Sequence, residues 1–155
     1  MTNKVKAIPE GYSALTPYLC VRDAARAIEF YKEVFGATEL MRLDAPDGKV
    51  GHAELKIGDA PFMLGDECPE ADIVSPLSLG GSPVMIMIYV EDVDRTASLA
   101  VAAGAKELKP VADQFYGDRS GQYKDPYGHI WSFATHIEDV SPEEINSRAA
   151  AMYGG

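Results

Sequence analysis

The chain has 155 residues, enough for one compact domain with a substantial hydrophobic core. Its formal net charge of −10 argues against nucleic acid and anionic membrane surfaces as partners, because both are bound through clustered Lys and Arg. No apolar run approaches the length of a membrane span and no secretory leader pattern is visible, so we expect a cytoplasmic protein.

The first half of the chain predicts one helix among four strands. Apolar residues within 12–21 predict a strand that is interrupted at Pro17. Asp23 is placed to cap a helix, and Gly36 is placed to end it. Three further strands are expected, at 38–43, 52–57 and 61–64.

The second half repeats this order after a linker. Residues 66–83 show no periodic pattern and are interpreted as that linker. Asp92 is placed to begin a helix and Gly104 to end it, residues 113–121 are predicted to form a loop, and a short helix is expected at 142–150. The strands of this half are expected at 84–90, 106–111, 122–124 and 130–134.

A short pattern, Val-x-Asp-x-x-Arg, occurs at the start of both predicted helices. It lies in residues 21–26 and 90–95, and its two aspartates, Asp23 and Asp92, are 69 residues apart. A repeat of this length predicts two copies of one β-α-β-β-β unit. We therefore predict an α+β fold in which curved mixed sheets surround a cleft. The prediction is a single domain, 1–155, with one module at about 12–65 and the other at about 84–136.

Several motifs resemble those of the vicinal-oxygen-chelate superfamily, which contains glyoxalases, bleomycin-resistance proteins and dioxygenases. They include Val21-Arg22-Asp23, Phe35-Gly36-Ala37, His52-Ala53-Glu54-Leu55, Tyr116-Gly117-Asp118-Arg119 and Asp125-Pro126-Tyr127-Gly128. Together with the segment 134–140, they are similar to the PhnB-like branch, over about residues 14–144. The resemblance implies the two-module fold around a cleft and a homodimer.

The resemblance also implies a divalent metal ion that is held by His and Glu side chains at four strand positions. In this sequence these positions hold Thr16, Glu54, Met85 and Ser132. One carboxylate, one thioether and two hydroxyls are a poor ligand set for such an ion. We therefore expect the metal site to be lost and no cofactor to be bound. The alternative is a site rebuilt from His52 and Glu54, which share one face of a strand, with a third ligand.

Candidate ligand-binding residues lie in the loop around residue 116. Tyr116, Asp118 and Arg119 combine an aromatic ring with both charges, which suits a small anion or a planar ligand. In the alternative interpretation, Asp118 and Arg119 form an ion pair that fixes the loop. Trp131 is either a core residue or a stacking platform, and His136 is expected to be a surface or packing residue.

The expected function is the binding of a small organic molecule. Thr16 and Met85, at positions where the family has metal ligands, would line the cleft. One alternative is a metal-dependent lyase, isomerase or dioxygenase-related enzyme that uses Glu54 and His52 as catalytic residues. Another is a metal-free enzyme with Glu54 or His52 as acid or base.

Overall fold

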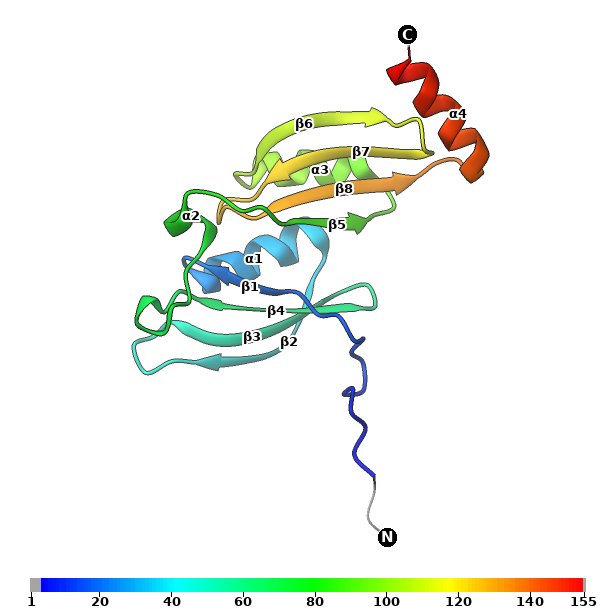
Figure 1. Cartoon of the computed structure of the whole chain (residues 1–155). Coiled ribbons are helices and arrows are strands. Elements are labelled where there is room, and N and C mark those ends of the chain that lie inside the picture. The colour runs from blue at the N-terminus through cyan, green and yellow to red at the C-terminus, as the bar shows by residue number, and fades with distance from the viewer. Residues whose placement is uncertain (1–3, 155) are drawn as a thin grey trace. The chain divides into compact units, whose positions relative to one another are not determined.

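The structure, a computed structural model, describes residues 4–154. The chain forms two compact units that divide between Gly81 and Ser82, within the predicted linker. Each unit holds one four-stranded mixed sheet and a helix that packs on one of its faces (Figure 1). Within these residues no helix is long and apolar enough to cross a membrane.

The first unit has the predicted element order. Its sheet runs in the order β1-β4-β3-β2, with β1 parallel to β4 and the other pairs antiparallel. The elements are β1 (Tyr18–Val21), α1 (Ala24–Phe35), β2 (Thr38–Asp44), β3 (Val50–Ile57), β4 (Ala60–Asp66), η1 (Pro69–Ala71) and α2 (Pro76–Leu79).

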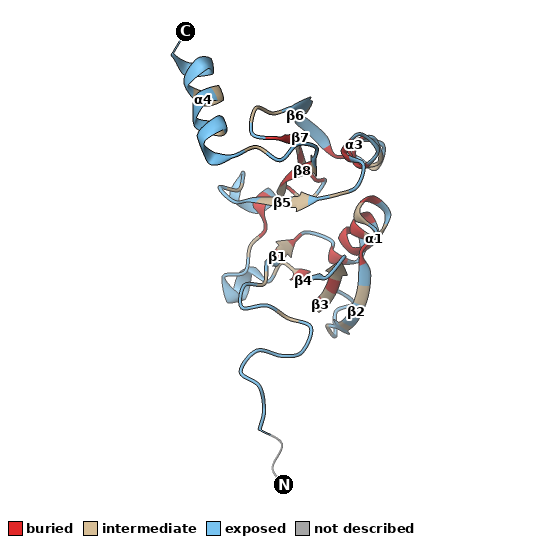
Figure 2. Ribbon diagram, turned by 90° about the vertical axis from the view of Figure 1, so that its right-hand side faces the viewer, coloured by how far each residue is buried: buried red, intermediate tan, exposed pale blue. Residues whose placement is uncertain are grey.

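Helix α1 packs its apolar side on β3 and β4. The Asp23 side chain accepts a hydrogen bond from the backbone N–H of Arg26, and Gly36 ends the helix with a φ of 66°. Tyr31 is fully buried and meets Phe62 of β4 edge to face, with 5.6 Å between the ring centroids. Figure 2 shows buried positions on α1 and on the strands. The apolar spacing along α1 therefore builds the core of this unit.

The second unit repeats the arrangement, with the strand order β5-β8-β7-β6 and β5 parallel to β8. Its core contains Trp131 and a stacked pair, Tyr123 and Phe133, whose ring centroids lie 5.0 Å apart. Helix α4 extends away from the sheet (Figures 1 and 2). The elements are β5 (Met85–Tyr89), α3 (Val93–Ala102), β6 (Lys106–Asp113), β7 (Asp118–Lys124), β8 (Ile130–His136) and α4 (Pro142–Tyr153).

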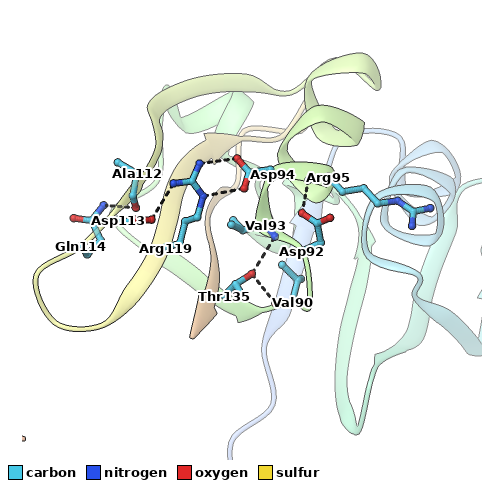
Figure 3. Close-up of polar contacts among 10 residues, drawn as sticks. All are labelled: Val90, Asp92, Val93, Asp94, Arg95, Ala112, Asp113, Gln114, Arg119 and Thr135. Atoms are coloured by element: carbon cyan, nitrogen blue, oxygen red, sulfur yellow. Dashed lines mark hydrogen bonds and ion pairs between the residues drawn. The ribbon is translucent and has the colours of Figure 1, made fainter. Parts of the chain in front are cut away.

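The repeat extends to a hydrogen bond between strand and helix. In the first unit, Asp66 of β4 accepts from the backbone N–H of Ala24 at 2.8 Å. In the second unit, Thr135 of β8 lies 69 residues after Asp66. Its hydroxyl oxygen accepts from the backbone N–H of Val93 at 3.0 Å (Figure 3). Both bonds satisfy an N–H group of a first helical turn, which has no partner inside its own helix. Each helix is thus fixed to its sheet at the same place.

Two predicted irregular segments contain regular structure. The expected linker, 66–83, holds η1 and α2, and Glu67 accepts hydrogen bonds from Ser75 and Ser78 at α2. The expected loop, 113–121, is shorter than predicted, since β7 already begins at Asp118. The single-domain organisation stays a prediction.

Candidate functional site

A chain of hydrogen-bonded side chains lies on β3 and the segments beside it. The Tyr12 hydroxyl donates to Oε2 of Glu54, and Nε2 of His52 lies 3.1 Å from Oε1 of the same carboxylate. Nδ1 of His52 lies 2.8 Å from the Tyr18 hydroxyl. We call these four residues, Tyr12, Tyr18, His52 and Glu54, the Glu54 cluster.

The alternation of β3 places this cluster on the face of the sheet opposite α1, which we call the open face. Ala53 and Leu55 are fully buried beneath α1, so His52 and Glu54, which alternate with them, point to the other side. Glu54 and Tyr18 both pair with Met63 of β4, which aligns them across the sheet. Sequence alternation thus predicted the shared face of His52 and Glu54 correctly.

The cluster keeps Glu54 ionised. The hydrogen bond from Tyr12, and then that from His52, lowers the pKa of the Glu54 carboxyl below its usual value. The same bond to Glu54 raises the pKa of Tyr12 to about 12. Because a base is most effective with a pKa near the working pH, a carboxylate held in this way is a weak proton acceptor.

Apolar side chains flank the cluster on the open face. Met41 of β2 pairs with Glu54, and Leu43 pairs with His52. Their exposed fractions are 39% and 55%, and that of Tyr18 is 56%. A charged group surrounded by exposed apolar surface is typical of a surface that binds an organic molecule.

The four positions where the resemblance implies metal ligands carry one carboxylate, one thioether and two hydroxyls, a donor set that suits a divalent ion poorly. Glu54 already engages both of its oxygens within the protein, and Thr16 before β1 is half-buried. In the second unit Met85 is exposed, and Ser132 has only 7% of its surface exposed. Over residues 4–154, no three His, Cys, Asp or Glu side chains are grouped so as to hold a metal ion.

A second polar group lies in the other unit, at the edge of a pocket of about 500 Å³. Asp118, 4% exposed, accepts from the Tyr89 hydroxyl at 2.8 Å, and its other oxygen lies 2.7 Å from Nδ1 of His136. Nε2 of His136 lies 2.8 Å from Asp139. The pocket is lined by Tyr89, Tyr116, Asp118, His136, Asp139, Val140, Ser141 and Ile145.

The side chains of Arg119 and Asp118 point apart, so the alternative interpretation, an ion pair between them, is wrong. Neighbouring residues of a strand point to opposite faces, and Arg119 turns away from the pocket. It bonds both oxygens of Asp94, at 2.8 and 2.9 Å, and one oxygen of Asp113 at 2.9 Å (Figure 3). We therefore assign Arg119 to the surface of the second unit and not to a ligand site.

Trp131 is a core residue, which was one of the two interpretations of the sequence. Its exposed fraction is 2%, and its indole N–H donates to Asp125 at 2.9 Å. We leave it out of the candidate site. His136, which was expected to be a surface or packing residue, is exposed and also lines the pocket with Tyr116 and Asp118.

Three residues of the two groups carry no recognisable signal in the sequence. Tyr12 lies in an irregular segment before β1, and Asp139 lies in the segment between β8 and α4. Tyr89 ends the apolar strand β5, where a tyrosine is ordinary. His136 is placed beside Asp118 by the antiparallel register of β7 and β8, which pairs the two residues directly.

Comparison with known proteins agrees with this architecture. The family model of the Glyoxalase/Bleomycin resistance protein/Dioxygenase superfamily matches residues 13–133. An uncharacterized protein of Mycobacterium bovis is 42% identical over 145 residues, which are 92% of this chain and 95% of that protein.

Solved structures are similar as well. TioX from Micromonospora sp. ML1 has a TM-score of 0.62 and 31% identity, and the match covers 81% of this chain and 99% of that one. A PhnB protein from Bacillus cereus has a TM-score of 0.63 at 18% identity, covering 79% of this chain and 99% of that one, and supports the fold alone. The chain belongs to the Glyoxalase/Bleomycin resistance protein/Dioxygenase superfamily.

Proposed function

We propose that the protein binds a small organic molecule on the open face of the first unit, at the Glu54 cluster, without a divalent metal ion. The observation that carries the proposal is the state of Glu54. This side chain stands where the resemblance implies a metal ligand, but the other three positions hold a thioether and two hydroxyls, and Tyr12 and His52 fix the carboxylate by one hydrogen bond to each oxygen. A fixed, ionised carboxylate among exposed apolar side chains provides one polar contact and an apolar surface for an organic ligand.

A second candidate function is metal-free acid–base catalysis by His52. The hydrogen bond between Glu54 and His52 supports it, since a carboxylate that orients an imidazole is a common arrangement for a base. The Tyr18 hydroxyl at the other ring nitrogen would complete a route for a proton. In this role Glu54 is a positioning residue, and the group that meets the substrate is His52.

Elemental analysis of protein purified without added metal is the first test. We expect much less than one equivalent of zinc, nickel, manganese or iron. One equivalent that disappears in Glu54→Gln, and that remains in Glu33→Gln, would overturn the metal-free proposal. Glu33 is the matched control because it is an exposed glutamate of the same unit, on α1.

A thermal-shift screen of small carboxylates, phosphonates, amines and planar aromatic compounds, run with a chelator present, is the second test. We expect at least one compound to raise the melting temperature of the wild type and of Glu33→Gln, but not that of Glu54→Gln. If no compound does so, binding at the Glu54 cluster is rejected. Turnover of a bound compound that is lost in His52→Gln, while binding is kept, would decide for the second candidate.

A further inference from the structure

The pocket of the second unit has walls that are fixed by backbone contacts. The carbonyl oxygen of Gly117 accepts from the N–H groups of Ile137 and Glu138, at 2.9 and 3.0 Å. Gly117 has a φ of 103°, and a Cβ at this position would lie 2.2 Å from the carbonyl oxygen of Glu138. Arg148 of α4 adds hydrogen bonds to Glu138 and to the carbonyl oxygen of Phe115. The segment after β8, which forms one wall of the pocket, is therefore fixed beside the start of β7 in the absence of a ligand.

The charges that line the pocket favour a cation. Asp118 and Asp139 supply two carboxylates, and His136 between them supplies at most one positive charge. The arginines of the neighbouring elements are engaged elsewhere. Arg119 pairs with Asp94 and Asp113, and Arg148 pairs with Glu138 and Glu144. An anion would find no uncommitted arginine on the elements that form this pocket.

The remaining lining suits an organic group. Tyr89 and Tyr116 contribute aromatic rings, and Val140 and Ile145 contribute apolar side chains. Aromatic rings attract cations through their negative faces, and apolar side chains bury hydrocarbon. A volume of about 500 Å³ lies within the range of small-molecule sites.

We propose that this pocket binds a small organic ammonium ion that carries an aromatic or aliphatic group, with the ammonium beside Asp118 and Asp139 and the apolar group against Val140 and Ile145. The pocket shares no residue with the Glu54 cluster, so the two proposals can fail separately. The ammonium ion takes the place, beside the two carboxylates, of the positive charge that His136 provides. Binding should therefore compete with the protonation of His136.

This competition predicts a dependence on pH. Hydrogen bonds to Asp118 and then Asp139 raise the pKa of His136 above its usual value. The titratable groups that line the pocket with it are those two carboxylates and the phenols of Tyr89 and Tyr116. Above the pKa of His136 its proton is lost and the pocket becomes more negative. The affinity for an ammonium ion should rise as the pH passes through this pKa.

The test uses three monosubstituted benzenes of similar size that differ in charge: benzylammonium, benzyl alcohol and benzoate. Each is titrated into the full-length protein and followed by backbone amide chemical shifts. We expect saturable shifts with benzylammonium, centred on residues 116–118 and 136–145, and much weaker binding of the other two. Equal binding of the alcohol or the benzoate, or shifts centred elsewhere, would overturn the proposal.

Variants test the roles of single side chains. Asp139→Asn should weaken benzylammonium binding about threefold, and Tyr116→Leu about fivefold. Asp113→Asn is the matched control, since Asp113 is also an exposed aspartate paired with a basic side chain but lies outside the pocket. It should bind as the wild type does. Unchanged binding in both test variants, or equal loss in the control, would overturn the proposal.

His136→Gln separates a charge effect from a structural one. Removal of the internal positive charge should strengthen benzylammonium binding and abolish its rise with pH. A merely structural role of His136 would weaken binding in this variant and would leave the slope with pH unchanged. Either of these results contradicts the proposed competition.

Discussion

At the scale of single residues, Glu67 of the first unit has a carboxylate with hydrogen-bond or charged partners at both of its oxygens. Oε1 accepts from the Ser75 N–H at 2.8 Å and from the Ser75 hydroxyl at 2.5 Å, and the Ser78 hydroxyl also donates to it. The other oxygen lies 3.5 Å from Nε of Arg22. These hydrogen bonds lower the pKa of Glu67 to about 2. Glu67 thus holds α2 to the end of β4.

Glu67→Gln should destabilise the protein by about 2 kcal/mol near neutral pH, because charged hydrogen bonds are replaced by neutral ones. The folded pKa is lowered, so this stabilisation is complete above the unfolded value of about 4.3. It is lost as the pH falls from there toward about 2. Urea unfolding at several pH values should show the wild type and the variant converging as the solution becomes acidic.

The control for this prediction is Glu33→Gln on α1, whose effect should be small at every pH. A difference between the wild type and Glu67→Gln that stays constant down to about pH 2 would contradict the assigned role of the carboxylate.

At the scale of elements, the two module helices begin with the same residue type in different backbone conformations. Asp23 and Asp92 each accept from the N–H three residues later, at 3.3 and 3.1 Å. Asp23 has a φ of 69°, in the left-handed region, whereas Asp92 has a φ of −136°. A residue with a Cβ is strained at the first position and unstrained at the second.

Alanine and glycine substitutions should therefore separate the two caps. Asp92→Ala is expected to cost about 1 kcal/mol through loss of the cap, and Asp23→Ala about 2 kcal/mol, because alanine also tolerates a positive φ poorly. Asp23→Gly should recover most of this loss. Chemical unfolding of Asp23→Ala, Asp23→Gly, Asp92→Ala and Asp92→Gly measures the difference in stability between alanine and glycine at each position. If the free energies of unfolding of the Ala and Gly variants differ equally at positions 23 and 92, the conformational argument is contradicted.

The elements were largely predictable because their signals are local. Capping aspartates, closing glycines and apolar spacing placed α1 and α3, and alternation placed the faces of β3. The start of β7 at Asp118 was missed, because polar residues in a strand look like a loop until the register with β8 is known. Likewise α2 depends on Glu67, which precedes Ser75 by eight residues and shows no helical spacing to it.

At the scale of the whole molecule, the predicted single domain can be tested through Trp131, the chain's one tryptophan. Trp131 is buried in the core of the second unit, whereas Glu67 belongs to the first. Small units of this size bury too little surface to be very stable alone. We expect Glu67→Gln to lower the unfolding midpoint seen by tryptophan fluorescence as much as that seen by circular dichroism. A fluorescence midpoint that does not move would show that the units unfold separately.

The sites were less predictable than the fold, since they depend on which distant residues meet. Glu54 and His52 could be placed on one face by alternation, but their partner Tyr12 comes from a segment without periodicity. Asp118 and Arg119 looked like a pair because they adjoin in sequence, and the strand sends them to opposite faces. Adjacent charges in a chain predict contact only when the local backbone is known.

Both proposed sites include residues that lie outside the segment matched by the family model. The matched segment begins at residue 13, one position after Tyr12, and ends at 133, before His136 and Asp139. A protein trimmed to those limits would lose the donor to Glu54 and one wall of the pocket. Superfamily members that differ from this chain at these flanking positions are therefore expected to bind different ligands, even where the segment between them is similar.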